Sequence, residues 1–216
     1  ALINNQPIKQ IIYSTKIEKF DEIRIKAKKN NIKLSLCTVK DAERISDTRN
    51  SQQIFALLEY PSLKNINTIN QNIEKPLIIL DGISDPGNMG TILRTCSWFG
   101  CYNIVLTNNS VELYNPKTVR AGMGAHFHME NIYKGSINDI IQYLKNYDYE
   151  ILTADLKGKH IEQIKLKNKI WSLILGNESQ GISNDFKKNS QQIHIPGNGK
   201  MESLNVAEAA SIVIHY

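Results

Sequence analysis

Three loops of this chain follow apolar runs and carry side chains that can bind a polar ligand, and the first begins at Asp81. It leads into a helix and holds Asn88 and Arg94. Asn88 is suited to cap the start of that helix. Arg94 stands among mostly apolar helical positions near the end of a strand, where a guanidinium suits a phosphate or a carboxylate. An arginine that reaches from the helix edge into solvent is the alternative interpretation.

The second loop follows the apolar run 171–175 and contains Glu178 between Gly176 and Gly181. Glycine allows the backbone to approach a flat ligand closely. A carboxylate directly after a buried strand therefore indicates a ligand-binding edge. A plain turn from a strand into a helix is the alternative.

The third loop follows a short strand expected at 192–195 and precedes an Ala-rich helix at the end of the chain. Ser203 and Asn205 can each cap that helix. Because a helix needs one such cap, one polar group is left over for a ligand. The segment therefore predicts a binding site, whereas chain ends are more often frayed and polar.

From Pro76 onward, apolar runs alternate with helical patterns, which is typical of a mostly parallel sheet covered by helices on both faces. Ligands bind to such sheets beyond the carboxyl ends of the strands, so the three loops should share one edge. We expect strands at 77–80, 103–106, 150–154, 171–175 and 192–195, and helices at 89–99, 116–123, 137–145, 183–188 and the end of the chain.

Residues 1–60 are predicted to form a separate small α/β domain. They hold 11 Lys and Arg against 7 Asp and Glu, within a chain of net charge +5. This excess favours a polyanion such as nucleic acid as the partner, and a solvated lysine-rich surface is the alternative. The polar, Asn-rich stretch 61–75 is expected to link it to a second domain, 76–216. In the first domain we expect strands at 11–13, 34–39 and 53–58, and helices at 19–30 and 41–46.

Several functional classes are disfavoured by motifs that the sequence lacks. It has no G-x-G-x-x-G after a strand, no P-loop and no G-x-S-x-G, which argues against nucleotide sites of these types and an acyl-transfer triad. The five histidines have no zinc-type spacing, and His126 and His128 alternate like packing residues of a strand. No apolar run reaches the roughly 18 residues of a membrane span. Three cysteines, an odd number, indicate reduced thiols and the cytoplasm.

Together, the three loops resemble the three signature motifs of the SpoU (TrmH-like) branch of the SPOUT RNA methyltransferases. The matching stretches, in the same order and spacing, are Asn88–Arg94, Leu175–Glu178 and Ile195–Val206. The resemblance implies an α/β fold with a C-terminal deep trefoil knot, a rare exception to unknotted topology. It also implies a homodimer with the active site near the subunit interface. Residues 1–60 resemble, more loosely, the small ribosomal-protein-like RNA-binding domain of many relatives.

By this resemblance, the chain transfers a methyl group from S-adenosyl-L-methionine to a ribose 2′-hydroxyl of RNA, without a metal ion. The implied catalytic residues are Asn88, Arg94, Glu178, Ser203 and Asn205. Arg94 would hold the phosphate beside the target ribose, and Glu178 and Asn88 would orient Arg94. The residues that would hold the cofactor, largely through backbone groups, are Gly176, Ile195 and Leu204, with Thr153 and Leu175 nearby.

The chain departs from the family pattern at Ser179, where a glycine often stands, and at Gly197, where many members carry methionine. Neither change removes a polar catalytic candidate. The first domain begins without an obvious first helix, and we expect it to be incomplete at its N-terminus. The leading hypothesis is a cytoplasmic methyltransferase of ribosomal RNA, because the extra domain favours ribosomal RNA. A transfer RNA 2′-O-methyltransferase and a catalytically inactive knotted RNA-binding protein are the alternatives.

Overall fold

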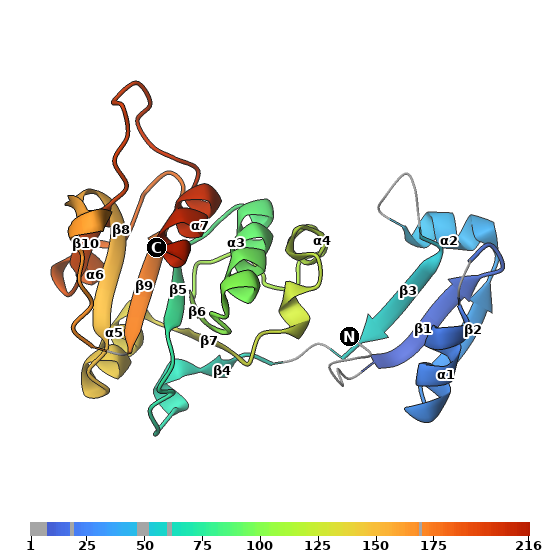
Figure 1. Ribbon diagram of the computed structural model, residues 1–216. Helices are drawn as coiled ribbons and strands as arrows, with labels where there is room; N and C mark the ends of the chain where they lie inside the picture. Colours follow the sequence, from blue (N-terminus) through green and yellow to red (C-terminus); the bar gives the residue numbers. More distant parts are fainter. Residues whose placement is uncertain (1–7, 18–19, 47–51, 60–61, 169) are drawn as a thin grey trace. The chain divides into compact units, whose positions relative to one another are not determined.

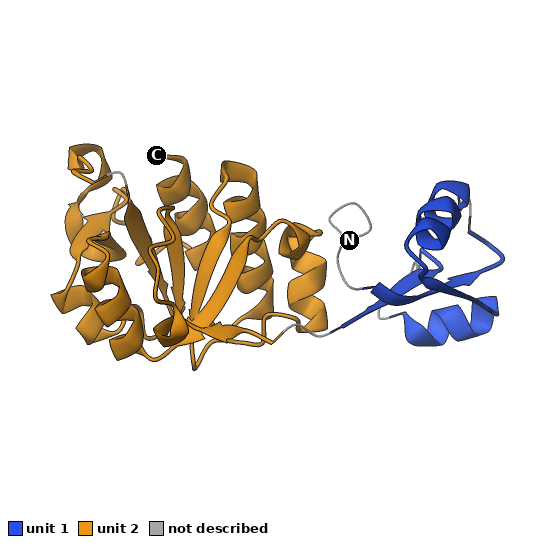
Figure 2. Ribbon diagram, turned by 90° about the horizontal axis from the view of Figure 1, so that it is seen from below, with its two compact units in different colours: residues 1–61 blue, residues 62–216 orange. Residues whose placement is uncertain are grey.

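The computed structural model describes residues 8–17, 20–46, 52–59, 62–168 and 170–216 (Figure 1). The chain divides into two compact units, Ala1–Pro61 and Ser62–Tyr216 (Figure 2). Among the described residues, no helix has both the length and the apolar character that a membrane crossing requires.

The first unit is a three-stranded sheet with two helices. Its elements are β1 (Ile8–Ser14), α1 (Asp21–Lys29), β2 (Lys33–Cys37), α2 (Val39–Ile45) and β3 (Ile54–Leu58). β1 lies in the middle, parallel to β2 and antiparallel to β3. Ile11 on β1, Ala27 on α1 and Ala42 on α2 are buried. These elements agree with the expected ones to within a few residues, and residue 19 of the expected first helix lies outside the described residues.

The second unit is built on a seven-stranded sheet in the order β10-β8-β9-β5-β6-β7-β4, and all its pairings are parallel. The strands are β4 (Lys64–Asn65), β5 (Leu77–Asp81), β6 (Asn103–Thr107), β7 (Asn131–Gly135), β8 (Glu150–His160), β9 (Trp171–Gly176) and β10 (Gln191–His194). The helices are α3 (Pro86–Phe99), α4 (Pro116–Gly122), α5 (Ile137–Asn146), α6 (Asn184–Lys188) and α7 (Val206–His215). The predicted mostly parallel α/β sheet is confirmed.

Helices cover both faces of this sheet (Figure 2). Because successive side chains of a strand point to opposite faces, β5 contributes to two cores. Ile78 and Leu80 pack in the core that includes α3 and α7, whereas Leu77 and Ile79 pack in the core that includes α5 and α6. All four side chains are fully buried, and each burial stabilises the fold by about 2 kcal/mol. This packing fixes β5, whose end leads into the first of the three loops.

The expected linker at 61–75 is wrong for most of its length, and residue 61 lies outside the described residues. Lys64 and Asn65 form β4, which pairs with β7, and the next residue, Ile66, is fully buried. The hydroxyl groups of Tyr143 and Tyr149 donate hydrogen bonds to the backbone carbonyls of Gln71 and Lys75 at 3.1 Å and 3.0 Å. The isoleucines scattered through this polar segment follow no firm period, so these long-range contacts could not be recognised in the sequence.

Two further expectations about the second unit are corrected. His126 and His128 do not alternate in a strand: His126 lies in the 3-10 turn Ala125–Phe127 and His128 directly follows it. The buried Nε2 of His126 lies 2.9 Å from the backbone oxygen of Leu113. The strand of this region, β7, begins only at Asn131 and was not predicted. The trefoil knot stays a prediction.

The carboxyl ends of the central strands bring the loops together. Asp81, the last residue of β5, pairs with Gly176, the last residue of β9. Next to them, Thr153 of β8 pairs with both Ile174 of β9 and Gln192 of β10. The loops after β5, β9 and β10 therefore start from one edge of the sheet, as expected.

Candidate active site

Glu178 lies at the centre of the polar contacts at this edge. Its carboxylate accepts hydrogen bonds from the backbone N–H and the hydroxyl of Ser84, at 3.2 Å and 2.8 Å. It also accepts from the backbone N–H of Asp85 at 3.2 Å and from Nδ2 of Asn88 at 2.9 Å. Partial burial raises the pKa of Glu178, but the hydrogen bonds from Asn88 and Ser84 outweigh it and lower the pKa to about 2. The carboxylate therefore stays ionised and joins the second loop to the first.

Asn88 does not cap its helix, contrary to the expectation. Asp85 is the N-cap of α3, and its Oδ1 accepts from the backbone N–H of Asn88 at 2.9 Å. Lys117 of α4 forms an ion pair with Oδ2 of Asp85 at 2.8 Å, and this contact lowers the pKa of Asp85. Pro86 fills the first helical position, which needs no N–H donor. The side chain of Asn88 is thereby left for contacts between the loops.

Asn205 connects the third loop to the other two. Its Oδ1 accepts from the backbone N–H of Ala207 at 2.8 Å, so it caps α7 as predicted. Its Nδ2 donates to Oδ1 of Asn88 at 3.1 Å. We call Ser84, Asn88, Glu178 and Asn205 the interlocked network, because it ties together all three motifs.

Two residues that the sequence analysis did not select hold the same loops. Nδ2 of Asn177 donates to the backbone oxygen of Gly82 at 2.7 Å. Asp81, which is 2% exposed, accepts from the backbone N–H of Ser183 at 2.7 Å. A buried carboxylate at the end of the apolar run 77–80 was the sequence signal that could have identified Asp81.

Arg94 is exposed on the outer side of α3 and, among the described residues, makes no hydrogen bond or ion pair. The expected contacts with Glu178 and Asn88 are therefore not made in this structure. The reason is helical geometry: Asn88 and Arg94 are six residues apart, so their side chains point about 120° apart around the helix axis. The guanidinium is available to a ligand.

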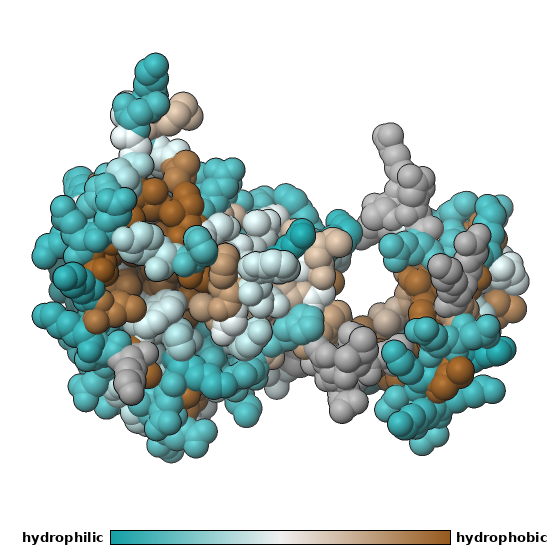
Figure 3. All heavy atoms as spheres, in the orientation of Figure 1, coloured by the Kyte–Doolittle hydropathy of each residue, from teal (hydrophilic) through white to brown (hydrophobic). Residues whose placement is uncertain are grey.

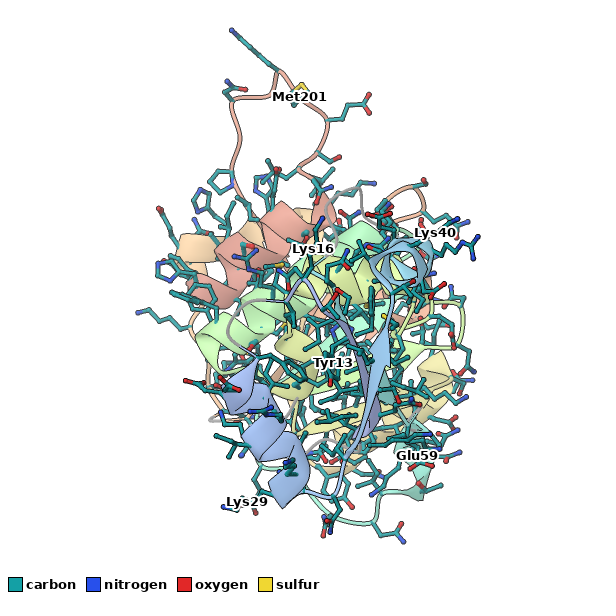
Figure 4. The ribbon with its side chains drawn as sticks, turned by 90° about the vertical axis from the view of Figure 1, so that its right-hand side faces the viewer. Tyr13, Lys16, Lys29, Lys40, Glu59 and Met201 are labelled. Atoms are coloured by element: carbon teal, nitrogen blue, oxygen red, sulfur yellow. The ribbon has the colours of Figure 1, made fainter. Side chains whose placement is uncertain are left out.

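Ser203 and the loop around it make few hydrogen bonds to the described part of the chain. Ser203 is exposed and makes no hydrogen bond within the described residues. Across 196–204, the described hydrogen bonding is limited to the backbone N–H of Lys200, which donates to Oδ1 of Asn198. The loop projects from the second unit between β10 and α7 (Figure 1), with Met201 at its tip (Figure 4). We call Arg94, Ser203 and the backbone of 196–204 the open groups.

The candidate cofactor residues surround the same edge. Leu175 and Thr153 are buried, and the Thr153 hydroxyl lies 2.9 Å from the hydroxyl of Ser190. Ile195 follows β10, and Leu204 is 48% exposed. These residues, with the free backbone of 196–204, fit a ligand held by main-chain groups and apolar contacts.

Gly176 is required where it is, because a Cβ there would lie 2.5 Å from the backbone carbon of Gly181 and 2.6 Å from the nitrogen of Ile182. The glycine lets the second loop fold back on the end of β9. There the backbone N–H of Asn177 and that of Gly181 each donate a hydrogen bond to the other residue's carbonyl oxygen. Among the described residues, no three His, Cys, Asp or Glu side chains gather to hold a metal ion.

Comparisons with known proteins agree with this site. The profile of the SpoU rRNA methylase family matches residues 75–215. An uncharacterized tRNA/rRNA methyltransferase of Borreliella burgdorferi is 34% identical over 215 residues, covering 94% of each chain. The 23S rRNA (guanosine(2553)-2′-O)-methyltransferase RlmP of Bacillus subtilis is 29% identical over 80% of this chain and 67% of its own length.

Among solved structures, the AdoMet-bound rRNA methyltransferase of Sinorhizobium meliloti is similar, with a TM-score of 0.87 and 25% identity. The likeness covers 99% of this chain and 80% of that one. Family profile, sequence relatives and fold thus agree over the part of the chain that carries the three motifs. The chain belongs to the SpoU rRNA methylase family, whose methyl donor is S-adenosylmethionine.

Proposed function

We propose that this chain methylates a ribose 2′-hydroxyl of RNA, with ribosomal RNA as the favoured substrate. The observation that carries the proposal is the interlocked network, which joins all three family motifs at one edge while Arg94 has no partner among the described residues. RlmP, whose name gives 2′-O-methylation of 23S rRNA, supports the ribose as the target. Transfer RNA is the second candidate, because the Borreliella relative is named for both RNA classes.

The methyl donor supplies an electrophilic methyl group on a sulfonium sulfur. Backbone groups of Gly176, Ile195 and Leu204 would hold it, beside the apolar side chain of Leu175. Thr153 acts differently, because its hydroxyl already contacts Ser190 and its strand lies between β9 and β10. We propose that Thr153 positions β8 beside the cofactor.

Arg94 would bind the phosphate beside the target ribose. A guanidinium recognises phosphate by charge and by paired N–H donors, and it stabilises the negative charge that develops on the attacking oxygen. It remains protonated, so it does not accept the proton. Because a 2′-hydroxyl is a weak nucleophile, alignment of this oxygen with the methyl group supplies much of the rate.

The interlocked network supplies that alignment. Glu178 is a poor base, since four hydrogen bonds occupy its carboxylate and its pKa is lowered to about 2. It holds the loops, with Asn88 and Asn205 as links. Ser203, whose hydroxyl is free, would contact the ribose. The hydroxyl proton passes to water, because no member of the network is a base near neutral pH.

We also propose a homodimer formed through α3 and α7. These helices pack together through the Thr95 and Ser211 hydroxyls, 3.0 Å apart. Their outer sides expose Trp98, which is 84% accessible, and Ile212. Figure 3 shows a hydrophobic area at α7. Exposed apolar clusters of this kind mark protein interfaces. We expect Ile212→Glu to give a monomer in light scattering, whereas Glu208→Gln on the same helix stays dimeric; a dimeric Ile212→Glu chain would refute this interface.

Three further features belong to the proposal. The likeness to SpoU structures supports a trefoil knot in the C-terminal segment. Residues 1–60 would aid capture of the RNA. RlmP, a bacterial relative, is named for 23S rRNA, and we propose that this enzyme likewise acts in the cytoplasm.

The test is methyl transfer by the full chain from tritiated S-adenosylmethionine to ribosomal RNA and to transfer RNA. The labelled product is then digested to nucleosides and identified by mass spectrometry. We expect a 2′-O-methylnucleoside from ribosomal RNA, formed about 10²–10³-fold less efficiently by Arg94→Ala. A base-methylated product would refute the ribose as target, label in transfer RNA alone would favour the second candidate, and no label in either would support an inactive RNA-binding protein.

A further inference from the structure

One end of the first unit concentrates lysine side chains. α1 ends at Lys29, and β2 begins four residues later at Lys33. Lys33 pairs with Gln10 of β1, so Lys9 lies at the same end of the sheet. We call the following five residues the lysine edge: Lys9, Lys26, Lys28, Lys29 and Lys33.

The two ends of this unit differ in charge. Among the described residues, Glu59 supplies the carboxylate at the lysine edge. Its Oε1 lies 3.5 Å from Nζ of Lys9. The other four lysines make no ion pair within the described residues. Figure 4 shows Lys29 and Glu59 at one end of the unit and Lys16 and Lys40 toward the other.

At that other end, the basic residues are balanced. Asp21 accepts from Arg24 at 2.8 Å, and Asp41 lies 3.9 Å from Arg44. Glu22 and Glu43 add two more carboxylates on the same helices. The net positive charge of the described part of the unit is therefore located at the lysine edge.

Helix geometry accounts for only part of this arrangement. Lysines in the last turn of α1 interact favourably with the helix dipole, which covers Lys26, Lys28 and Lys29. Lys9 and Lys33 lie at the starts of strands, where no such dipole acts. Like charges three residues apart on a helix, as at Lys26 and Lys29, repel one another, and a bound anion would relieve this repulsion.

We propose that the lysine edge binds the phosphate backbone of the RNA substrate, an inference that rests on the proposed function. Lysine is a compact point charge on a flexible stem, which suits phosphates and does not read bases. The first unit would thus raise affinity without selecting sequence. The base or ribose to be modified would be chosen at the second unit.

The test compares two matched double variants of the full chain. Lys29→Gln with Lys33→Gln removes two charges from the lysine edge, and Lys16→Gln with Lys40→Gln removes two from the other end. The probe is a fluorescein-labelled ribosomal RNA hairpin, measured by anisotropy between about 50 and about 200 mM KCl. Melting temperatures confirm that both chains fold, and Lys26→Gln with Lys28→Gln is a second variant of the same edge.

We expect the lysine-edge variants to weaken hairpin binding by about 30-fold near 0.1 M salt and to lower the slope of log K against log salt by about 1.5. The control double should stay near the wild type, and kcat at saturating RNA should not change. Equal losses in both doubles, or an unchanged salt slope, would overturn the proposal. Because binding is measured without methyl transfer, a chain that binds through this edge but transfers no methyl group refutes the proposed function alone.

Discussion

Glu178 and Arg94 are the opposite charges of the candidate active site, and their surroundings differ. The carboxylate of Glu178, although exposed, accepts four hydrogen bonds from the loop after β5 and the first turn of α3. The guanidinium of Arg94, on the helix that follows this loop, is exposed and unpaired within the described residues. The polar groups of the interlocked network form hydrogen bonds within the protein, whereas those of the open groups are available to a ligand.

This contrast separates two kinds of contribution to one reaction. A loop that must hold a cofactor gains from internal bonds, which fix its shape before binding. A side chain that must bind RNA cannot already be bonded to another part of the protein. Variants of the interlocked network should therefore weaken cofactor binding, and variants of the open side chains Arg94 and Ser203 should change methyl transfer alone.

The largest effect is expected from an open group. Arg94→Ala should lower kcat/KM for methyl transfer by about 10²–10³, as for the loss of one donor to developing negative charge. The melting temperature should not change, because Arg94 has no partner in the described residues. Thr91→Ala, one turn earlier on the same side of α3, is the control and should retain activity. An active Arg94→Ala chain would remove Arg94 from the mechanism.

A smaller effect is expected at the link between the first and third motifs. Asn205→Asp keeps the acceptor that caps α7 but loses the Nδ2 donor to Asn88. We expect methyl transfer to fall about tenfold, the equivalent of one hydrogen bond, with melting close to the wild type. Asn205→Ala also loses the cap and should cost about 1 kcal/mol of stability. If the Asp and Ala variants melt alike, the cap contributes nothing.

The smallest effect is the pH dependence of stability due to Glu178. Its pKa falls from 4.5 to about 2 on folding, so its stabilisation is present above pH 4.5 and is lost as the pH falls toward 2. Glu178→Gln lacks this titration. The difference in melting temperature between wild type and Glu178→Gln should therefore shrink from pH 5 to pH 2. A constant difference would show that the carboxylate is not held in its charged form.

Local patterns were sufficient to predict the central strands and to limit the cap of α7 to Ser203 or Asn205. The buried runs around Leu77–Leu80 and 171–175 are too apolar for any surface element, and Asn205 precedes an Ala-rich helix. The shared edge of the loops followed from the parallel sheet. The sequence was therefore enough to bring Asn88, Glu178 and Asn205 to one place.

The contacts within that place were not predictable. Glu178 accepts a hydrogen bond from Ser84, which is 94 residues away in the sequence. A local pattern of apolar and polar residues does not indicate such a distant pair. Asp85 competes with Asn88 for the cap, and only the position of Pro86 in the folded helix decides between them. Ile66 likewise joins the core that includes α5 and α6, from an Asn-rich segment whose isoleucines follow no firm period.

The most direct test of the contrast is the affinity for S-adenosylmethionine of two variants, Glu178→Gln and Arg94→Ala, measured by calorimetry on the full chain. With the cofactor loop loosened, Glu178→Gln should bind about tenfold more weakly than the wild type. Arg94→Ala should bind with unchanged affinity. Equal weakening of both variants, or weakening of Arg94→Ala alone, would contradict the division between the interlocked network and the open groups.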